Sequence, residues 1–185
     1  MKTYQTDQIR NIALLGNTGA GKTILAESMM FAGKVIERKG TIEAKSTVSD
    51  YTEIEQQNQR SIFSTVLYTE FNGHKINIID TPGSDDFVGG VISAMRPVDM
   101  GVMVVNSQYG VEVGTEIFGR HAERLHKPII FAVNQLDHDK ANFEQTIDSL
   151  KVSFGPKVTP VQYTVNAGSD FNAIIDLISM KMYHY

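Results

Sequence analysis

The sequence predicts a three-layer α/β fold with a mixed, mostly parallel sheet, and three observations lead to it. Four short apolar runs, the first at residues 11–15 and the last at 129–133, each lead into a polar loop and a helix-like stretch. A glycine-rich loop joins the first run to its helix, and an Asn-Gly pair at 72–73 separates two strand-like runs. Buried parallel strands have this character because helices cover both faces of their sheet. Ligands of such folds bind at the carboxyl ends of the strands.

The predicted elements follow one another in a regular order. After the glycine-rich loop we expect a helix and then a β-hairpin, because Asn-Gly between strand-like runs is a strong hairpin signal. One strand of the sheet should therefore be antiparallel. The expected strands are residues 11–15, 61–71, 75–79, 100–105 and 129–133, and the expected helices include 22–32 and 87–95, the latter closed by Pro97.

Two regions depart from this alternation. Residues 33–60 form a long polar connection with little hydrophobic periodicity, and such a connection in a compact domain is usually functional or mobile. A merely disordered loop is the alternative. The tail reads as short strands or strand-helix pieces at residues 160–165, 172–175 and 180–185.

Composition limits the classes of function. The chain has 185 residues, enough for one well-cored domain and part of a second, and its formal net charge of -4 argues against a nucleic-acid-binding surface. It has no cysteine, which excludes disulfides, a thiolate nucleophile and cysteine-ligated metals. No apolar run is long enough to span a bilayer. We therefore expect a cytoplasmic protein with no membrane partner and no sequence-specific DNA partner.

Residues 16–23 read GNTGAGKT and satisfy the pattern G-x-x-x-x-G-K-[ST] of a phosphate-binding loop. The glycines let backbone N–H groups close around phosphate oxygens, which a Cβ would obstruct. Lys22 is expected to reach the β- and γ-phosphates, and the Thr23 hydroxyl to ligate Mg²⁺. The full set of expected phosphate contacts is Asn17, Thr18, Gly19, Ala20, Gly21, Lys22 and Thr23.

The tetrapeptide DTPG at residues 80–83 directly follows the strand predicted at 75–79. As an isolated tetrapeptide it is also a good turn. Its position 57 residues after Thr23, at a strand end, favours a second residue of the metal site. We expect Asp80 to hold Mg²⁺ through a water and the Gly83 N–H to face the γ-phosphate.

The third motif, NQLD at residues 134–137, comes directly after the last apolar strand. A carboxylate at Asp137 can accept two hydrogen bonds from the N1–H and 2-amino groups of guanine. Adenine lacks both donors, so Asp137 would select GTP over ATP. Asn134 would brace the loop, beside Gln135. The alternative for this motif alone is a turn asparagine with a solvated aspartate.

Together the three motifs occur in one order on successive strand ends, which is the arrangement of the Ras-like P-loop GTPases. The ligands expected from this order are GTP or GDP with Mg²⁺. Longer stretches resemble the G domain of elongation factor G, from about residue 9 to the end of the chain. They are RNIALLGNTGAGKTILAESM, INIIDTPGSDDFVGGVISAMRPVD, GVEVGTE and IIDLISMKMYHY.

The passages DYTEIE and DFVGGVISA look closer to the divergent elongation factor G-like branch than to the main form. Ribosomal protection proteins for tetracycline share these motifs and are the alternative. The resemblance implies a GTP-driven factor that binds the GTPase centre of the ribosome and promotes translocation. It also implies a P-loop GTPase core at residues 1–155 and the start of an inserted subdomain at 156–185. The family's last core strand and helix, with its final guanine-contacting loop, would lie beyond this chain.

Two departures from the family pattern concern catalysis. The family follows DTPG with a histidine that positions the attacking water, and Ser84 stands there in this sequence. A hydroxyl on so short a side chain cannot reach the same place, and losing a general acid–base group costs on the order of 10² to 10⁴ in rate. The family's R-G-I-T carries a threonine that closes over Mg²⁺, and Phe63 occupies that position. Ser61 or Ser64 could substitute if the register shifts.

Two further departures concern nucleotide binding. Gln135 replaces a lysine that lies along the guanine and bonds to the phosphate loop, so we expect weaker binding. Gly19 replaces an aspartate, at little cost. Lys22 and Ser84 are thus the candidate catalytic positions, with hydrolysis expected to be weak or lost. Three functions stay open: a ribosome-stimulated GTPase that tolerates these changes, a non-hydrolysing ribosome-docking module, and a free-standing regulatory small GTPase.

Overall fold

The structure, a computed structural model, describes residues 2–185. Its strands are β1 (Ile9–Leu15), β2 (Thr65–Phe71), β3 (His74–Asp80), β4 (Met100–Asn106), β5 (Ile129–Asn134), β6 (Gln162–Val165), β7 (Ala173–Asp176) and β8 (Lys181–His184). Its α-helices are α1 (Lys22–Ala32), α2 (Glu53–Asn58), α3 (Val88–Met95), α4 (Val113–Arg124) and α5 (Phe143–Phe154). Short 3-10 helices span Thr6–Gln8 and Asp85–Phe87.

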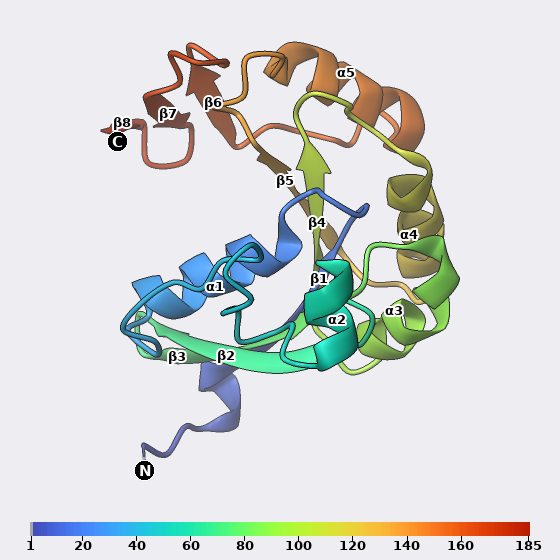
Figure 1. The fold of residues 1–185 in the computed structure, drawn as a ribbon. Coiled ribbons are helices and arrows are strands. Elements are labelled where there is room, and N and C mark those ends of the chain that lie inside the picture. The colour runs from blue at the N-terminus through green and yellow to red at the C-terminus, as the bar shows by residue number, and fades with distance from the viewer. Residues whose placement is uncertain (1) are drawn as a thin grey trace.

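Five of the strands form a central sheet in the order β2-β3-β1-β4-β5 (Figure 1). All neighbouring pairs in it are parallel except β2 and β3, which form an antiparallel hairpin. The hairpin turns at Asn72 and Gly73, both with positive φ, and its first pair joins Thr65 to Asp80. The predicted mixed, mostly parallel sheet is therefore confirmed.

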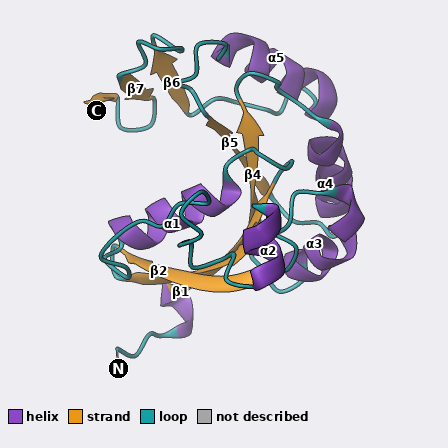
Figure 2. Ribbon diagram, viewed as in Figure 1, coloured by secondary structure: helices purple, strands orange, loops and turns teal. Residues whose placement is uncertain are grey.

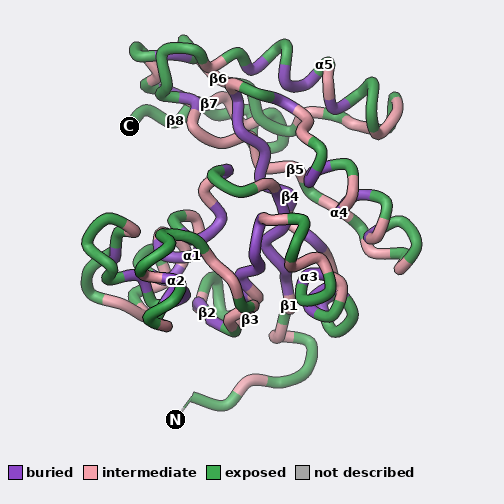
Figure 3. Tube along the Cα trace, turned by 45° about the vertical axis from the view of Figure 1, so that its right-hand side comes forward, coloured by how far each residue is buried: buried purple, intermediate pink, exposed green. Residues whose placement is uncertain are grey.

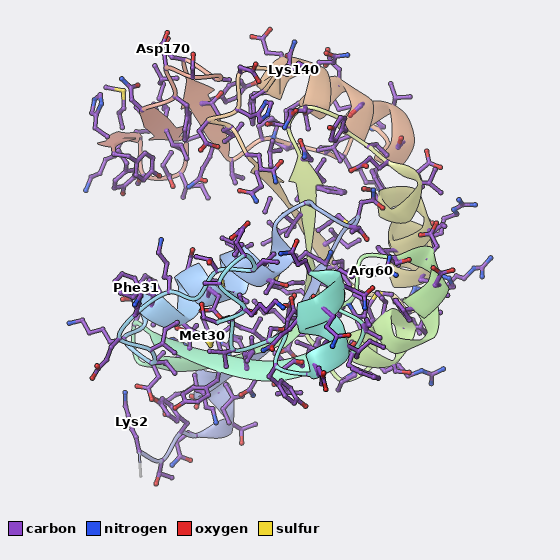
Figure 4. The ribbon with its side chains drawn as sticks, viewed as in Figure 1. Lys2, Met30, Phe31, Arg60, Lys140 and Asp170 are labelled. Carbon is purple, nitrogen blue, oxygen red and sulfur yellow. The ribbon has the colours of Figure 1, made fainter. Side chains whose placement is uncertain are left out.

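Helices cover both faces of the central sheet, so the fold has three layers (Figures 1 and 3). Alternate residues of β1 point to opposite faces, as the period of a strand requires. Ile12 and Leu14 pack in a cluster with α1, where Met30 lies between the helix and the sheet (Figure 4). Ala13 and Leu15 pack in a larger cluster with α3, α4 and α5. Figure 3 shows the buried strands between these two groups of helices.

Local signals explain where the helices begin. α1 starts directly after Gly21, whose φ of 95° turns the chain out of the loop. α5 starts after Asn142, whose side chain accepts a hydrogen bond from the Gln145 N–H at 2.9 Å, the usual role of an N-cap.

Within residues 2–185 no helix combines the length and the apolar character needed to cross a membrane.

The long polar connection after α1 contains α2, a short helix that the sequence did not lead us to expect. Thr52 and Glu55 form a capping box around its first turn. The Thr52 hydroxyl donates to the Glu55 carboxylate at 2.6 Å, and the Glu55 N–H donates back to that hydroxyl at 3.4 Å. The Thr52 N–H also donates to this carboxylate, at 3.3 Å. Backbone donors at the helix start are thus satisfied, so a six-residue segment that is polar except for Ile54 can form a helix here.

The first strand of the hairpin is shorter than predicted. It begins at Thr65, and the predicted residues 61–64 lie outside it. The reason is a competing acceptor: the N–H groups of Ile62 and Phe63 donate to the carboxylate of Glu55 at 3.0 and 3.1 Å. These residues are therefore tied to α2 and not to the sheet.

The tail forms the small antiparallel sheet β6-β7-β8, which confirms short strands in this region. Figure 2 shows this sheet beside α5, near the C-terminus. The ring of Phe143 on α5 meets that of Tyr163 on β6 edge-on, with centroids 5.4 Å apart. The predicted boundary after residue 155 falls just beyond α5, and the division into two units stays a prediction.

Candidate nucleotide-binding site

The glycine-rich loop lies between β1 and α1 and approaches the neighbouring strands closely. Gly16 has a φ of 134°, and a Cβ on it would collide with the backbone carbonyl of Val104 on β4. A Cβ on Gly21 would collide with the side-chain amide of Asn134 at the end of β5. Glycine is required at both positions because only it adopts these backbone angles without strain and leaves the space free. The loop is therefore positioned at the carboxyl ends of the parallel strands.

Lys22 is buried within this loop and only 6% exposed. Its ammonium donates to the carbonyl oxygens of Gly16 at 2.9 Å and Asn17 at 3.0 Å. Burial lowers the pKa of Lys22 to about 8, although the carboxylates of Asp80 and Asp50 act in the opposite direction. An anionic ligand in the loop would give this buried ammonium a negatively charged partner in place of neutral carbonyls.

Thr23 and Asp80, the two residues predicted to hold Mg²⁺, are in direct contact. The Thr23 hydroxyl donates to Asp80 Oδ2 at 2.8 Å, and the Ser49 hydroxyl donates to the same oxygen at 2.7 Å. Burial raises the pKa of Asp80, while the hydrogen bonds from Ser49 and Thr23 lower it. The second oxygen, Asp80 Oδ1, is buried and has no hydrogen-bond partner among the described residues. Buried polar atoms are nearly always paired, so this oxygen fits a cation or a water bound to one.

The donor set here suits Mg²⁺. This cation binds oxygen, and in nucleotide sites it takes one or two carboxylates, substrate phosphates and several waters. In the part of the chain that the structure describes, no group of three or more His, Cys, Asp or Glu side chains could hold a metal ion. A cation beside Thr23 and Asp80 would therefore also need phosphate or water oxygens.

The DTPG turn lies against the phosphate loop at Gly83. A Cβ on Gly83 would come within 2.5 Å of both the Thr18 backbone nitrogen and the Lys22 ammonium. Since one of these atoms is backbone, any side chain at this position would displace the loop itself. Asp80 thus lies beside Thr23, and Gly83 lies against the phosphate loop.

The NQLD motif contacts the other side of the phosphate loop. Asn134 Nδ2 donates to the carbonyl oxygen of Ala20 at 2.9 Å, and Gln135 Nε2 donates to that of Gly19 at 2.9 Å. Gln135 also accepts a hydrogen bond from the Asn106 side chain. The predicted brace at Asn134 is present in the geometry, and Gln135 reaches the loop although it is shorter than lysine. The expected weakening of nucleotide binding at Gln135 stays a prediction.

Asp137 stands apart from these contacts. Its side chain is exposed to solvent, whereas the preceding Leu136 is buried and anchors the turn in the core. The Leu136 carbonyl oxygen accepts a hydrogen bond from the Gly168 N–H at 2.8 Å, which ties the turn to the loop before β7. The carboxylate of Asp137 is therefore presented outward from a fixed turn, as contact with a planar base would require.

Ser84 and Phe63, the two positions that depart from the family's catalytic pattern, make no hydrogen bond with Thr23 or Asp80 in the described part of the chain. The Ser84 hydroxyl donates to Asp86 Oδ2 at 3.1 Å, at the start of the 3-10 helix. Phe63 is 55% exposed. Of the two serines that could replace it, Ser61 lies with its hydroxyl 3.2 Å from Thr23 Oγ1, while the Ser64 hydroxyl lies 3.5 Å from the Gly90 carbonyl oxygen.

The structure adds two residues that the sequence did not single out, Ser49 and Asp50. Like Ser61, which the sequence had named as a possible substitute, they come from the connection between α1 and β2 and lie near the Thr23–Asp80 pair. A spacing of 31 residues or more separates Ser49 from Asp80 and Ser61 from Thr23, so no local pattern shows these contacts.

Two buried glutamates hold this connection in place. Glu27 on α1 accepts hydrogen bonds from the N–H groups of Gly40 at 2.8 Å and Val48 at 2.6 Å. Glu55 accepts those of residues 62 and 63, described above. Burial raises the pKa of Glu55, but the hydrogen bonds from Thr52 and the two backbone groups outweigh it and leave the pKa below its ordinary value. Here the sequence did carry a signal, the Thr52-x-x-Glu55 pattern of a capping box. Figure 4 shows Arg60 beside α2, at the end of this connection.

A large cavity lies away from this cluster. It measures about 1300 Å³ and is bordered by α4, β5, α5 and the start of the small sheet. Its lining includes Phe131, Phe143 and Phe154, and none of the predicted nucleotide contacts. The phosphate loop and this cavity are therefore separate features of the molecule.

Comparison with known proteins agrees with the motif order. The family described as the elongation factor Tu GTP binding domain matches residues 7–182. An elongation factor G-like protein from Thermotoga maritima is 35% identical over 177 residues, which is 96% of this chain and 25% of that protein. Elongation factor G from Mycoplasma pneumoniae is 34% identical over 184 residues, covering 100% of this chain and 27% of that protein.

Solved structures show the same likeness. The crystal structure of a protein from Thermus thermophilus superposes with a TM-score of 0.91 at 32% sequence identity, over 96% of this chain and 27% of that one. This chain thus spans about a quarter of the length of the relatives that it matches.

Proposed function

Because this chain belongs to the family of the elongation factor Tu GTP-binding domain, we propose that it binds GTP and GDP with Mg²⁺ within an elongation factor G-like translation factor. The observation that carries the proposal is the meeting of three motifs from β1, β3 and β5 around one loop. Thr23 bonds to Asp80 on one side of the loop, and Asn134 bonds to Ala20 on the other. The partner in this proposal is the GTPase centre of the ribosome, in the cytoplasm.

Each residue then has a definite task. Lys22 exchanges its two loop carbonyls for phosphate oxygens, and its buried position strengthens that attraction. Thr23 and Asp80 hold Mg²⁺, which neutralises charge on the β- and γ-phosphates when bound. The Gly83 N–H faces the γ-phosphate. Asn134 and Gln135 brace the loop, and Asp137 accepts the hydrogen bonds that distinguish guanine from adenine.

Binding is tested by titrating the full chain with GDP, GTP and ATP in the presence of Mg²⁺. We expect both guanine nucleotides to bind at least about 100-fold more tightly than ATP, since ATP leaves the Asp137 carboxylate without a donor. Equal affinity for GTP and ATP would contradict the assignment of Asp137, and no nucleotide binding would contradict the proposal as a whole.

For hydrolysis we propose slow or absent turnover, which makes a ribosome-docking module the second candidate function. Two observations favour it: Ser84 is engaged with Asp86, and Phe63 is exposed where the family has a cation-binding threonine. Placing the nucleophile and stabilising the transferred phosphoryl group are most of what a GTPase does. A chain that lacks both groups keeps nucleotide binding and loses rate.

The turnover experiment uses ribosomes, GTP and Mg²⁺ with the variants Ser84→His and Phe63→Thr. We expect background turnover in the natural chain and an increase of at least about tenfold in the double variant, because a general acid–base group contributes about 10² or more. Strong ribosome-stimulated turnover by the natural chain would identify an active GTPase instead. No increase in any variant would contradict the role assigned to these two positions.

A further inference from the structure

Asp50 is a buried carboxylate that no role described so far explains. It is 5% exposed, and its Oδ1 atom has no hydrogen-bond partner in the described residues. Among residues 2–185, Asp80 Oδ1 is the other buried carboxylate oxygen without a hydrogen-bond partner. Buried charged groups are ordinarily paired or coordinate a metal, because burying an isolated charge is costly. Two unpaired carboxylate oxygens in one network therefore indicate a shared ligand.

Asp50 directly follows Ser49, a residue whose side chain is bonded at the Thr23–Asp80 pair. Its neighbour Ser49 donates to Asp80 Oδ2 at 2.7 Å, and the Ser61 hydroxyl lies 3.2 Å from Thr23 Oγ1. The Ser49 carbonyl oxygen also accepts a hydrogen bond from the Thr65 hydroxyl at 3.1 Å, which fixes residues 49–50 to the start of β2.

The electrostatic environment of Asp50 agrees with that placement. Burial raises the pKa of Asp50, the nearby Ser61 hydroxyl lowers it, and the charge of Asp80 raises it further. The Lys22 ammonium lowers the pKa of both carboxylates. The charges of Asp80 and Lys22 thus both act on the Asp50 carboxyl.

We propose that Asp50 is a second acidic residue of the Mg²⁺ site and supplies, from the connection before β2, the cation contact that Phe63 cannot supply. This inference rests on the proposed nucleotide binding. Mg²⁺ in nucleotide sites takes one or two carboxylates and keeps several waters, so Asp50 and Asp80 complete a set of the usual size with Thr23. The connection between α1 and β2 then senses the cation through a carboxylate in place of a threonine hydroxyl.

A purely structural role for Asp50 leads to the opposite expectation in the absence of metal. If Asp50 only supported the fold, Asp50→Asn would lower the melting temperature. If Asp50 binds a cation, its carboxylate is an unpaired buried charge in the metal-free protein. Replacing it with a neutral amide then leaves the melting temperature equal or higher. Stability without metal and affinity for metal therefore separate the two roles.

The experiment measures retention of a fluorescent GDP analogue by the full chain at buffered free Mg²⁺ concentrations. The variants are Asp50→Asn, Asp50→Glu and the control Asp170→Asn, an exposed aspartate at the far side of the molecule from α2 (Figure 4). We expect Asp50→Asn to raise the Mg²⁺ concentration at half-retention by about 10- to 100-fold, the usual range for weakening a metal site. Asp50→Glu, which keeps the charge, should fall between, and Asp170→Asn should match the natural chain.

Two further readouts complete the test. In EDTA, Asp50→Asn should bind the GDP analogue as tightly as the natural chain or more tightly, since a negative charge near the phosphates has gone. Its melting temperature without metal should not fall. An unchanged Mg²⁺ midpoint in Asp50→Asn, with Mg²⁺-dependent binding intact in the natural chain, overturns this inference alone. Absence of Mg²⁺-dependent GDP binding in the natural chain overturns the proposed function and this inference together.

Discussion

The phosphate end and the base end of the site are held in different ways. The phosphate end is buried and already hydrogen-bonded within the protein: Lys22 donates to a loop carbonyl, and Thr23 donates to Asp80. At the base end, Asp137 is exposed on a turn that is anchored by Leu136. Under the proposed function, the phosphate end would exchange internal hydrogen bonds for those of a ligand, while the base end would add new ones.

This difference indicates where affinity and selectivity come from. An interlocked, buried phosphate end supplies strong electrostatic attraction in a low-dielectric setting, and it depends on the fit of every member. An exposed carboxylate contributes little to the fold, so its replacement can change selectivity without changing stability. The three predictions that follow test this division, beginning with the largest expected effect.

Gly83→Ala should abolish most nucleotide binding. The new Cβ would lie within 2.5 Å of the Thr18 nitrogen and the Lys22 ammonium, so the phosphate loop must move. We expect GDP affinity to fall by about 10²-fold or more, because a misplacement of about 1 Å can cost that much where a precise geometry is needed. Calorimetric titration with GDP and Mg²⁺ measures the loss. The matched control is Gly89→Ala on α3, where a Cβ meets nothing within 4 Å and alanine should stabilise the helix slightly. Equal affinity in both variants would show that the loop tolerates displacement.

Asp137→Ala should remove selectivity while keeping the fold. Guanine would lose its acceptor and adenine would lose nothing, so the ratio of GTP to ATP affinity should fall by about 10²-fold. The melting temperature should stay within a degree or two, because the side chain is exposed. Competition between the two nucleotides gives the ratio directly. Asp139→Ala, two residues along and also exposed, is the control. A preserved ratio in Asp137→Ala would place the base elsewhere.

Glu27→Gln should loosen the connection between α1 and β2 without touching the base end. The carboxylate accepts two backbone hydrogen bonds, from Gly40 and Val48, and bonds to a charged acceptor are worth roughly 1.5–3 kcal/mol each. A neutral amide should reduce protection of these two amides from hydrogen exchange by about tenfold, a cost of about 1.4 kcal/mol. Glu43→Gln, exposed in the same connection, is the control. Unchanged protection would show that other contacts hold the segment.

The sequence predicted the parts of the site that rest on local chemistry. The loop at residues 16–23 and the turns at 80–83 and 134–137 each come at the end of an apolar strand, and the topology of a parallel sheet then gathers strand ends on one edge. The mixed sheet could also be predicted, because Asn72-Gly73 signals its one antiparallel strand within a few residues.

The parts that could not be predicted rest on contacts between distant residues. Ser49 meets Asp80 across 31 positions, and Glu27 meets Val48 across 21. Hydroxyls and carboxylates in a polar connection have many possible partners, and only the folded chain selects one. The start of β2 was misplaced for the same reason, since Glu55 takes up the N–H groups that a strand would have used.

The order of the sheet has a consequence for how the site comes into being during folding. The β2–β3 hairpin joins neighbours in sequence, but β1 pairs with β3 across 66 positions, as Ile9 opposite Lys75 shows. Pairings of such separation close a long loop and are slow to form. The bond between Thr23 and Asp80 depends on that closure, so the proposed nucleotide site forms only once β1 and β3 have paired. A nucleotide that recognises only the finished pocket will slow the unfolding of this chain and leave its rate of folding unchanged.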